Sequence, residues 1–335
     1  MVVLTAATVV VGTRDDSGAA YGRRVQRLGV VFPDRTLSLR AQRAHVDALA
    51  DWGYTDLWAG ESDGADAFGA LTAAAAWDTP LRMGTAVVSA FLRPRALLAM
   101  SAAALHELAT GGFVVGIGAS SPVIVERWND VSYVDPATRV RDTAGFLRRV
   151  FAGERVHGFR LARAPVTPPP VYLAALRPAM LRLAAEVADG VILTCVSVED
   201  VARMREFIAP DREVVAWLTV CPSDDAVAVR AAARSRLAGY LAAPAYEAQQ
   251  RWLGRGTVLQ PMWDAWRNGA GIAHAAALIP DEVVDALVVH GSPDACTRHI
   301  ERFIAGGVTT PILDVLPGVV EVADAWRMLA PQRRS

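Results

Sequence analysis

The chain has 335 residues, of which 53% are hydrophobic, and a formal net charge of -1. This length can bury one large core or two smaller ones, and the balanced charge provides no global field that favours nucleic acid or an anionic membrane. Cys195, Cys221 and Cys296 lie far apart without a CxxC or Cys/His spacing, which argues against a disulfide framework and against zinc and predicts buried thiols in a reducing cytosol.

The first 25 residues contain a short apolar run with no basic segment before it, so they make a poor signal peptide. We expect residues 1–25 to be a flexible extension and residues 26–330 to form a single domain. No uninterrupted apolar run reaches the roughly 18 residues that a membrane span requires. The expectation is a cytoplasmic protein with no membrane or nucleic-acid partner.

From residue 27 onward, short apolar runs alternate with segments of helical periodicity. The predicted strands are 27–32, 55–60, 81–88, 113–118, 170–175, 191–195, 213–220 and 310–316. The predicted helices are 38–54, 66–80, 93–112, 137–153, 178–190 and 198–209, with a small hairpin expected within 155–169. A long helical section from about 224 to 305 is interrupted at Pro244, Gly254, Gly269–Gly271 and 290–294.

The eight predicted strands do not alternate apolar with polar residues, which is typical of parallel strands covered by helices on both faces. Eight βα units over roughly 300 residues predict a TIM-like (β/α)8 barrel with insertions, whose usual size is about 250 residues. A doubly wound open sheet is the main alternative, but it would need fewer strands or a second domain. In a barrel the functional residues lie on the loops that follow the strands.

The residues predicted at these strand ends include no histidine and few carboxylates, so no metal site is expected, and no Ser/His/Asp set converges. A small, apolar and hydroxyl-rich mouth suits a large organic ligand better than an ion. The strand-end candidates are Phe32, Pro33, Asp34, Glu61, Ser62, Ser89, Ala90, Phe91, Gly118, Ala119, Ser120, Ser121, Ala175, Leu176, Arg177, Cys195, Val196, Ser197, Cys221, Pro222, Ser223, Leu316 and Pro317.

Two of these loops have features of an anion site. The run "GFVVGIGASS" (112–121) places two glycines at the end of the fourth strand, either to let backbone approach a ligand or to form a tight strand exit. The run "AALRPAMLRLAAE" (174–186) opens a helix with Pro178, whose first turn leaves free N–H groups beside the cation of Arg177. An ordinary βα loop is the alternative interpretation here.

Several stretches together resemble a known family: "LGVVFP", "YTDLWAGES", "LRMGTAVV", "LATGGFVVGIGASS", "PPPVYLAALRPAMLRLAAEVADGVIL" and "VVHGSPDACTRHIERFIAGGVTTPIL". In this order they resemble the luciferase-like monooxygenase superfamily and, within it, the actinobacterial F420-dependent oxidoreductases. The resemblance covers about residues 27 to 316. Residues 236–254 also resemble the family's helix ahead of the last barrel strand.

The resemblance implies a barrel that binds a flavin or a 5-deazaflavin, F420, with its ring deep in the mouth. It assigns the cofactor phosphate to the loops after the fourth and fifth predicted strands, and a non-prolyl cis peptide bond behind the ring to Ala86–Val87. Where the family usually has glycine, this chain has Arg177, so either that loop has a negative φ or the arginine binds the phosphate. The implied phosphate-binding residues are Gly116, Ile117, Gly118, Ala119, Ser120, Ala175, Leu176, Arg177 and Pro178.

The stretch "LWAGES" (57–62) ends in Glu61 and Ser62, where similar deazaflavin enzymes often carry an acidic residue followed by histidine. A serine hydroxyl is a poor proton source near neutral pH, so the usual acid does not carry over. Glu61 either serves as the acid, if burial raises its pKa, or only accepts hydrogen bonds from backbone or cofactor. The resemblance makes both residues catalytic candidates and Glu61 a cofactor contact.

The remaining aromatic and histidine candidates carry less weight. Tyr240 and Tyr246 either line the substrate cavity or pack between helices, and Trp58 is expected in the core. Trp128 and Tyr133 are candidates for the floor or lid of the site. His290 is expected to cap a loop, whereas the helical histidines His45, His106 and His299 are expected to be structural.

These features predict an oxidoreductase that uses F420 to move a hydride to or from an electron-poor C=C or C=N bond of a small organic substrate. An FMN-dependent monooxygenase of the same fold is the first alternative. A relative that binds the cofactor without catalysis is the second, supported by Ser62. The resemblance also implies a homodimer.

Overall fold

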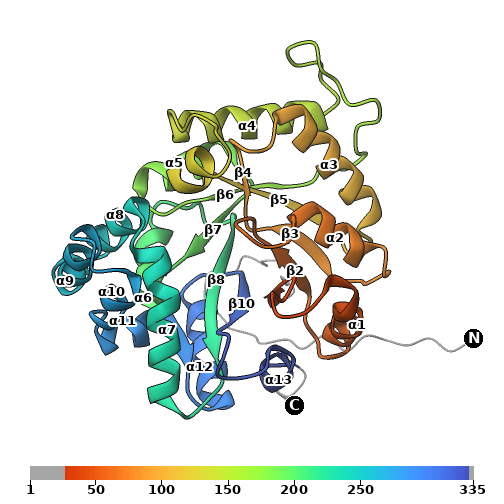
Figure 1. Cartoon of the computed structure of the whole chain (residues 1–335). Coiled ribbons are helices and arrows are strands. Elements are labelled where there is room, and N and C mark those ends of the chain that lie inside the picture. Colours follow the sequence, from red (N-terminus) through yellow and green to blue (C-terminus); the bar gives the residue numbers. More distant parts are fainter. Residues whose placement is uncertain (1–26, 332–335) are drawn as a thin grey trace, which may run out of the picture.

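The computed structural model describes residues 27–331 (Figure 1). The predicted extension at residues 1–25 lies outside this range. The described strands are β1 (Gly29–Val31), β2 (Asp56–Ala59), β3 (Arg82–Thr85), β4 (Val88–Ser89), β5 (Phe113–Gly118), β6 (Val171–Ala174), β7 (Gly190–Thr194), β8 (Glu213–Cys221), β9 (Val288–His290) and β10 (Thr310–Val315).

Eight of these strands form a closed parallel barrel in the order β1-β2-β3-β5-β6-β7-β8-β10. Closure comes from β10, which pairs with β1 through Gly29 and Ile312 and with β8 through Thr310 and Val215. The short strands β4 and β9 add to β5 and β8 outside this ring. The predicted (β/α)8 barrel is therefore confirmed, and a doubly wound open sheet is excluded because the described sheet closes.

Helices surround the barrel (Figure 1). They are α1 (Arg43–Asp51), α2 (Ala67–Ala75), α3 (Arg95–Leu108), α4 (Pro136–Phe151), α5 (Pro178–Val187), α6 (Val198–Arg205), α7 (Ala226–Leu241), α8 (Pro244–Trp252), α9 (Gly256–Arg267), α10 (Ile272–Ala277), α11 (Asp281–Leu287), α12 (Pro293–Ala305) and α13 (Val322–Met328), with a 3-10 turn η1 (Leu39–Gln42) and a π-helical turn η2 (Val123–Arg127). Helices α7 to α11 form the long insertion ahead of the last barrel strand.

Local sequence fixes where several helices begin and end. Ser197 and Asp200 form a reciprocal capping box at the start of α6, which satisfies two of the amides that a helix start leaves free. Prolines occupy the first position of α4, α5, α8 and α12, where a missing N–H costs nothing. Gly53, with a φ of 87°, follows the first helical segment as predicted.

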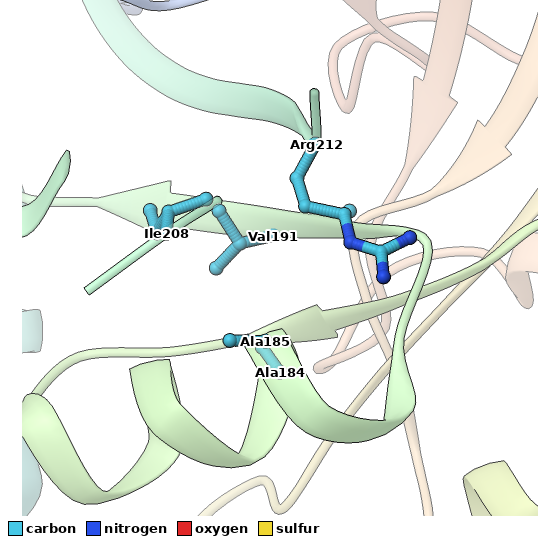
Figure 2. A pocket seen from close by; sticks show the side chains of 6 residues that line it. Ala184, Ala185, Val191, Ile208 and Arg212 are labelled. Carbon is cyan, nitrogen blue, oxygen red and sulfur yellow. The ribbon is translucent and has the colours of Figure 1, made fainter. Parts of the chain in front are cut away.

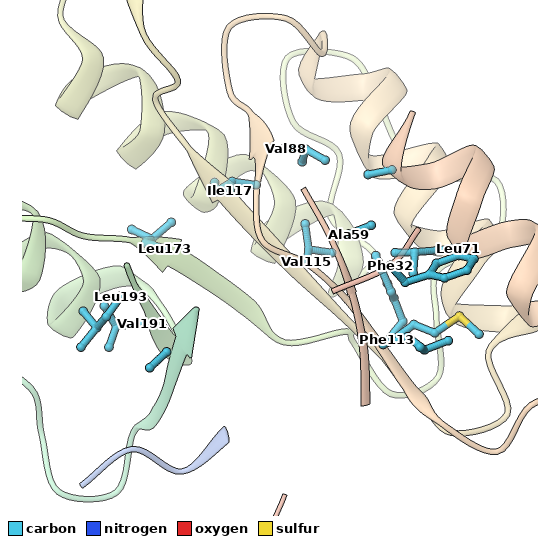
Figure 3. Packing of buried hydrophobic residues seen from close by; sticks show 14 of the residues in the cluster. Phe32, Ala59, Leu71, Val88, Phe113, Val115, Ile117, Leu173, Val191 and Leu193 are labelled. Carbon is cyan, nitrogen blue, oxygen red and sulfur yellow. The ribbon is translucent and has the colours of Figure 1, made fainter. Parts of the chain in front are cut away.

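The core has two layers because successive strand residues point to opposite faces. Phe113, Val115 and Ile117 of β5 pack outward against the helices, in a cluster that also contains Leu173 and Leu193 (Figure 3). The alternate residues point inward. Trp58, Val114, Tyr172, Ile192, Val215 and Ile312 form the buried interior of the barrel. The assignment of Trp58 to the core is confirmed.

The interior at the amino ends of the strands is closed by charged side chains. Arg82 donates from Nε to Asp56, from Nη1 and Nη2 to Glu213 at 3.0 and 2.6 Å, and from Nη2 to Thr310 at 3.3 Å. Tyr172 also donates to Glu213, at 2.5 Å. Burial alone would raise the pKa of Glu213, but the bonds and charge of Arg82 outweigh it and hold that pKa at about 2.

Three sequence predictions need correction in detail. The run 81–88 is not one strand, because the chain bulges between β3 and β4. The helical section 224–305 contains the strand β9, since a strand of three residues, two valines and a histidine, is too short to show a periodicity of its own. The predicted hairpin within 155–169 is reduced to a single antiparallel bridge between Val156 and Phe159.

Candidate functional site

The carboxyl ends of the barrel strands form a mouth with two unlike halves. On the β2 to β6 side the inward positions are small residues: Gly60, Ala86, Gly118 and Ala174. On the β7 to β10 side they are Thr194, Trp217 and Asp314. A Cβ on Gly60 would lie 3.3 Å from the Trp217 ring, so the two halves meet across the mouth. Small side chains therefore line one side of the mouth, and larger polar or aromatic side chains line the other.

The bulge between β3 and β4 lies in the small half. The peptide bond Ala86–Val87 is cis, as the resemblance implied. A Cβ on Gly118 would approach Val87 to 2.7 Å, so glycine is needed for the strand to pass the bulge. The Thr85 hydroxyl donates to the Gly116 carbonyl and accepts from its amide, both at 2.8 Å. The Gly116 amide is thus already bonded and is not a free donor for a phosphate.

The two loops with predicted anion-binding features lie next to each other, because Ile117 of β5 pairs with Leu173 of β6. Ser120 follows β5 with a φ of 63°, which turns the chain into η2. Ala175 differs from its neighbours, since its amide donates to the Ile192 carbonyl at 3.1 Å. Within residues 27–331, no hydrogen bond uses the amides of Ala119, Ser120, Leu176 or Arg177.

The backbone at Arg177 shows why this chain does not need a glycine there. Its φ of -146° and ψ of 166° are extended backbone, so the glycine that is usual in the family is not required. Its side chain is exposed and makes no ion pair with another described residue. Together with the amino end of α5 and the neighbouring open amides, it forms a donor set suited to a phosphate group.

Glu61 is held by Arg93 and by the start of α2. Arg93 donates from Nε to both carboxylate oxygens, at 3.1 and 3.2 Å, and from Nη2 to Glu61 and Asp66. The Ala67 amide donates to Glu61 at 3.2 Å. Both Glu61 and Arg93 keep 18% of their side chains exposed. The carboxylate therefore accepts hydrogen bonds from backbone and guanidinium while still reaching the surface of the mouth.

Ser62 points to a different group of side chains. It accepts from Arg35 at 3.0 Å and donates to Asp63 at 2.8 Å, and Arg35 also pairs directly with Asp63. The hydrogen bonds from Arg35 and Ser62 hold the pKa of Asp63 below its ordinary value. Because Glu61 bonds to Arg93 instead, the adjacent residues Glu61 and Ser62 do not act as a hydrogen-bonded pair.

The polar half of the mouth contains residues that the sequence analysis did not select. Asp314 of β10 accepts from Trp217 Nε1 at 3.0 Å and from Arg236 Nη2. Arg236 lies one helical turn before Tyr240 on α7, with its guanidinium 5.6 Å from the Tyr240 ring centroid. The only sequence signals were a carboxylate inside an apolar strand and an i, i+4 spacing.

Two tyrosines from the insertion complete this half. The rings of Tyr240 and Tyr246 lie 5.5 Å apart in an edge-to-face arrangement. Burial raises the pKa of Tyr240 to about 12 and that of the Cys195 thiol to about 12. The buried amides of Gln249 and Gln250 donate to the carbonyls of Thr194 and Cys195 at 3.0 and 2.9 Å, which holds α8 over the end of β7.

The loop after η2 contacts the loops that follow β4 and β5. Tyr133 donates to the Ser120 carbonyl at 3.2 Å, and its ring lies 4.8 Å from that of Phe91. Arg139 holds the same region by donating to the Ala90 carbonyl at 2.9 Å. Trp128 is half exposed. Tyr133 thus ties the loop after β4 to the loop after β5.

His290 has a structural partner, and the three cysteines are buried. His290 ends β9 and bonds Asp285 through Nε2 at 2.9 Å. Cys195, Cys221 and Cys296 are buried and free, as predicted. Among residues 27–331 no group of three or more potential ligands could hold a metal ion. Nor does any helix in this range have the length and apolar character to cross a membrane.

Two hollows lie outside the centre of the mouth. One, of about 260 Å³, lies at its rim and is lined by residues of the loops after β1 and β2, including Arg35, Leu39 and Asp63. The other lies between α5 and the start of β7, away from the carboxyl ends of the strands, and Figure 2 shows Val191, Ile208 and Arg212 among the side chains that line it. Only the first is placed to take part in the site.

Comparison with known proteins places the chain among recognised relatives. The sequence profile described as luciferase-like monooxygenase matches residues 10–310. A putative coenzyme F420-dependent oxidoreductase of Mycobacterium tuberculosis is 27% identical over 308 residues, which cover 80% of this chain and 88% of the relative. The 5,10-methylenetetrahydromethanopterin reductase of Methanolobus tindarius is 25% identical over 287 residues, covering 79% and 87%.

Solved structures show the same fold. The coenzyme F420-dependent tetrahydromethanopterin reductase of Methanopyrus kandleri superposes with a TM-score of 0.72 at 19% identity, covering 91% of this chain and 97% of the other. The oxygenating constituent of 3,6-diketocamphane monooxygenase from Pseudomonas putida, in complex with FMN, superposes with a TM-score of 0.63 at 15% identity, covering 91% and 97%.

Proposed function

The chain belongs to the luciferase-like monooxygenase family, and we propose that it is an oxidoreductase that uses coenzyme F420 to move a hydride to or from an electron-poor C=C or C=N bond. The observation that carries the proposal is the donor set beside the small half of the mouth. Open amides at Ala119, Ser120 and Leu176 meet the amino end of α5 and the cation of Arg177, beside a strip lined by Gly118 and Ala174.

This arrangement fits a planar cofactor that carries a phosphate. The phosphate would lie on the open amides and Arg177, since backbone donors at a helix start favour anions. The ring would lie against the bulge at Ala86–Val87, and Tyr133 would help to exclude water from that side. When bound, F420 supplies a carbon that gives or takes a hydride.

Names of relatives favour F420 over FMN. Two relatives that align over about four fifths of this chain have names that refer to F420 or to a reductase. The FMN-dependent monooxygenase remains the second candidate, because a solved structure with the same fold contains FMN. Both cofactors carry a phosphate and a fused ring, so the donor set alone does not separate them.

A titration of the purified protein with F420 and with FMN, followed by fluorescence quenching, tests the choice. We expect F420 to bind and FMN to bind far more weakly. Tight FMN binding without F420 binding would overturn the proposal in favour of the monooxygenase. F420 binding with no turnover of any unsaturated or imine substrate would favour the non-catalytic relative.

Glu61 and Ser62 are the two residues that we propose to be catalytic, beside the deazaflavin ring. Glu61→Gln keeps the size of the side chain but can neither take up nor pass on a proton, so it should slow single-turnover oxidation of reduced F420 by roughly a hundredfold or more while F420 still binds. Asp66→Asn is the matched control, because Asp66 shares Arg93 but lies on the exposed side. An unchanged rate in Glu61→Gln would remove Glu61 from the mechanism.

A further inference from the structure

The polar half of the mouth has more hydrogen-bond donors than acceptors. Arg236 gives only Nη2 to Asp314, whose other partner is the indole N–H of Trp217. Its Nε is buried, and no residue in the described range accepts from it. The side chain as a whole keeps 24% of its surface exposed, so it is not fully closed off from solvent. Buried donors are nearly always bonded, which marks this one for explanation.

Tyr240 supplies a second donor at the same place. Its ring lies beside the Arg236 guanidinium, and its hydroxyl has no hydrogen-bond partner in the described part of the chain. Tyr246 packs against it edge to face, which limits where the Tyr240 ring can turn. Arg236 and Tyr240 therefore present donors from one face of α7.

Charge balance decides what these donors can take. Arg236 is neutralised by Asp314, and Arg35 at the rim is neutralised by Asp63. Across the mouth, Arg93 is shared between the carboxylates of Glu61 and Asp66. No cation among these groups is left without a counter-charge, so an anionic ligand gains little, whereas a neutral oxygen acceptor gains hydrogen bonds at no electrostatic cost.

We propose that Arg236 and Tyr240 form the substrate-recognition site, and that they bind the carbonyl oxygen of a neutral α,β-unsaturated ketone or related carbonyl compound. This inference rests on the proposed function and narrows it. The electron-poor bond is a C=C conjugated to a carbonyl, and the two donors hold that oxygen on the side of the mouth opposite the small residues. Hydrogen bonds to this oxygen also draw electrons from the conjugated carbon, which favours hydride attack there.

Binding measurements with defined probes test the site. Ligand-observed NMR would measure the affinities of cyclohex-2-en-1-one, carvone and testosterone, with cyclohexene as the analogue without oxygen and cyclohex-1-ene-1-carboxylate as the anionic analogue. We expect at least one enone to bind more tightly than both analogues. Arg236→Gln should weaken that enone roughly tenfold and Tyr240→Phe roughly fivefold, as expected for lost hydrogen bonds.

Controls separate this inference from general damage. Arg234→Gln makes the same substitution on α7, at an arginine that bonds Asp281 and the Ile279 carbonyl instead of facing the mouth, and it should leave enone affinity unchanged. Tyr240→Phe keeps the ring and should fold normally. Circular dichroism and F420 quenching on each variant should match the wild-type protein.

The outcomes are distinct. The inference is overturned if no enone binds, if the carboxylate binds more tightly than the enones, or if Arg236→Gln and Tyr240→Phe retain wild-type enone affinity. If the wild-type protein does not bind F420, the proposed function is overturned instead. Enone affinity is measured without cofactor as well, so the recognition site is judged independently.

Discussion

Two arginines form ion clusters at opposite ends of the same barrel, and they differ in how many of their donors are used. At the amino ends of the strands, Arg82 finds acceptors for Nε, Nη1 and Nη2 on Asp56, Glu213 and Thr310. At the mouth, Arg236 finds one acceptor, Asp314, and leaves Nε buried without a partner.

The difference indicates what each cluster is for. A buried guanidinium whose donors are all bonded by the protein is explained by the fold, because it closes the barrel interior and joins its own strand β3 to β2, β8 and β10. A guanidinium with unbonded, buried N–H groups carries a desolvation penalty that no hydrogen bond within the protein offsets. The first cluster is therefore expected to matter for stability, and the second mainly for binding.

The largest effect should come from Arg82→Met. It leaves Glu213 without its cation, and it leaves the fully buried Asp56 with Arg27, at 3.3 Å, as its remaining cation. Breaking a buried pair in this way costs about 3–5 kcal/mol in the free energy of unfolding. Urea denaturation would measure it. Arg163→Met, which breaks an exposed pair with Glu107, is the control and should cost no more than about 1 kcal/mol. A loss below about 1 kcal/mol in Arg82→Met would contradict the structural role.

Acid should weaken the same cluster. The folded-state pKa of Glu213 is about 2, against an ordinary 4.5, so its contribution is present above pH 4.5 and is lost as the pH falls to about 2. The size is of the order of 3 kcal/mol. The difference in unfolding free energy between the wild-type protein and Glu213→Gln should shrink across this window. A constant difference would show that Glu213 is not the group that titrates.

Sequence alone was sufficient for the barrel but not for these clusters. The eight apolar runs predict the strands because a strand buried on both faces shows its burial in every residue. Such runs contain or adjoin the charged residues Asp56, Arg82 and Glu213. Contact among their side chains depends on the register of the barrel strands, which no local sequence pattern predicts. The same holds for Asp314 and Arg236, which lie on different elements and meet only at the mouth.

The loops proposed to hold the cofactor show a different limit. The loops after β5 and β6 could be selected from glycines, a helix start and Arg177, since each is a local signal. The hydrogen bond from the Gly116 amide to the Thr85 hydroxyl could not be predicted from sequence, because it depends on how β3 lies against β5. The cis bond at Ala86–Val87 came from family resemblance, as Ala-Val is an ordinary strand pair.

Arg236→Gln should lower stability much less than Arg82→Met, by about 1–2 kcal/mol. Asp314 would keep the Trp217 N–H as a donor, and the Arg236 side chain is partly exposed already. Urea denaturation beside Arg234→Gln on the same helix would measure the difference. A loss of 3 kcal/mol or more would place the mouth cluster in the same structural class as the one at the other end.

The smallest effect is the coupling inside the mouth cluster. Trp217 and Arg236 both donate to the same oxygen of Asp314, so each partly compensates for the loss of the other. Trp217→Phe should therefore cost more when Arg236 is already Gln, with an interaction energy of about 1 kcal/mol in a double-mutant cycle. The matched cycle between Trp217→Phe and Arg82→Met joins the two ends of the barrel, which share no partner, and should be additive to within about 0.5 kcal/mol. Equal coupling in both cycles would mean that the two clusters respond as one network, and the separation between a structural end and a binding end would fail.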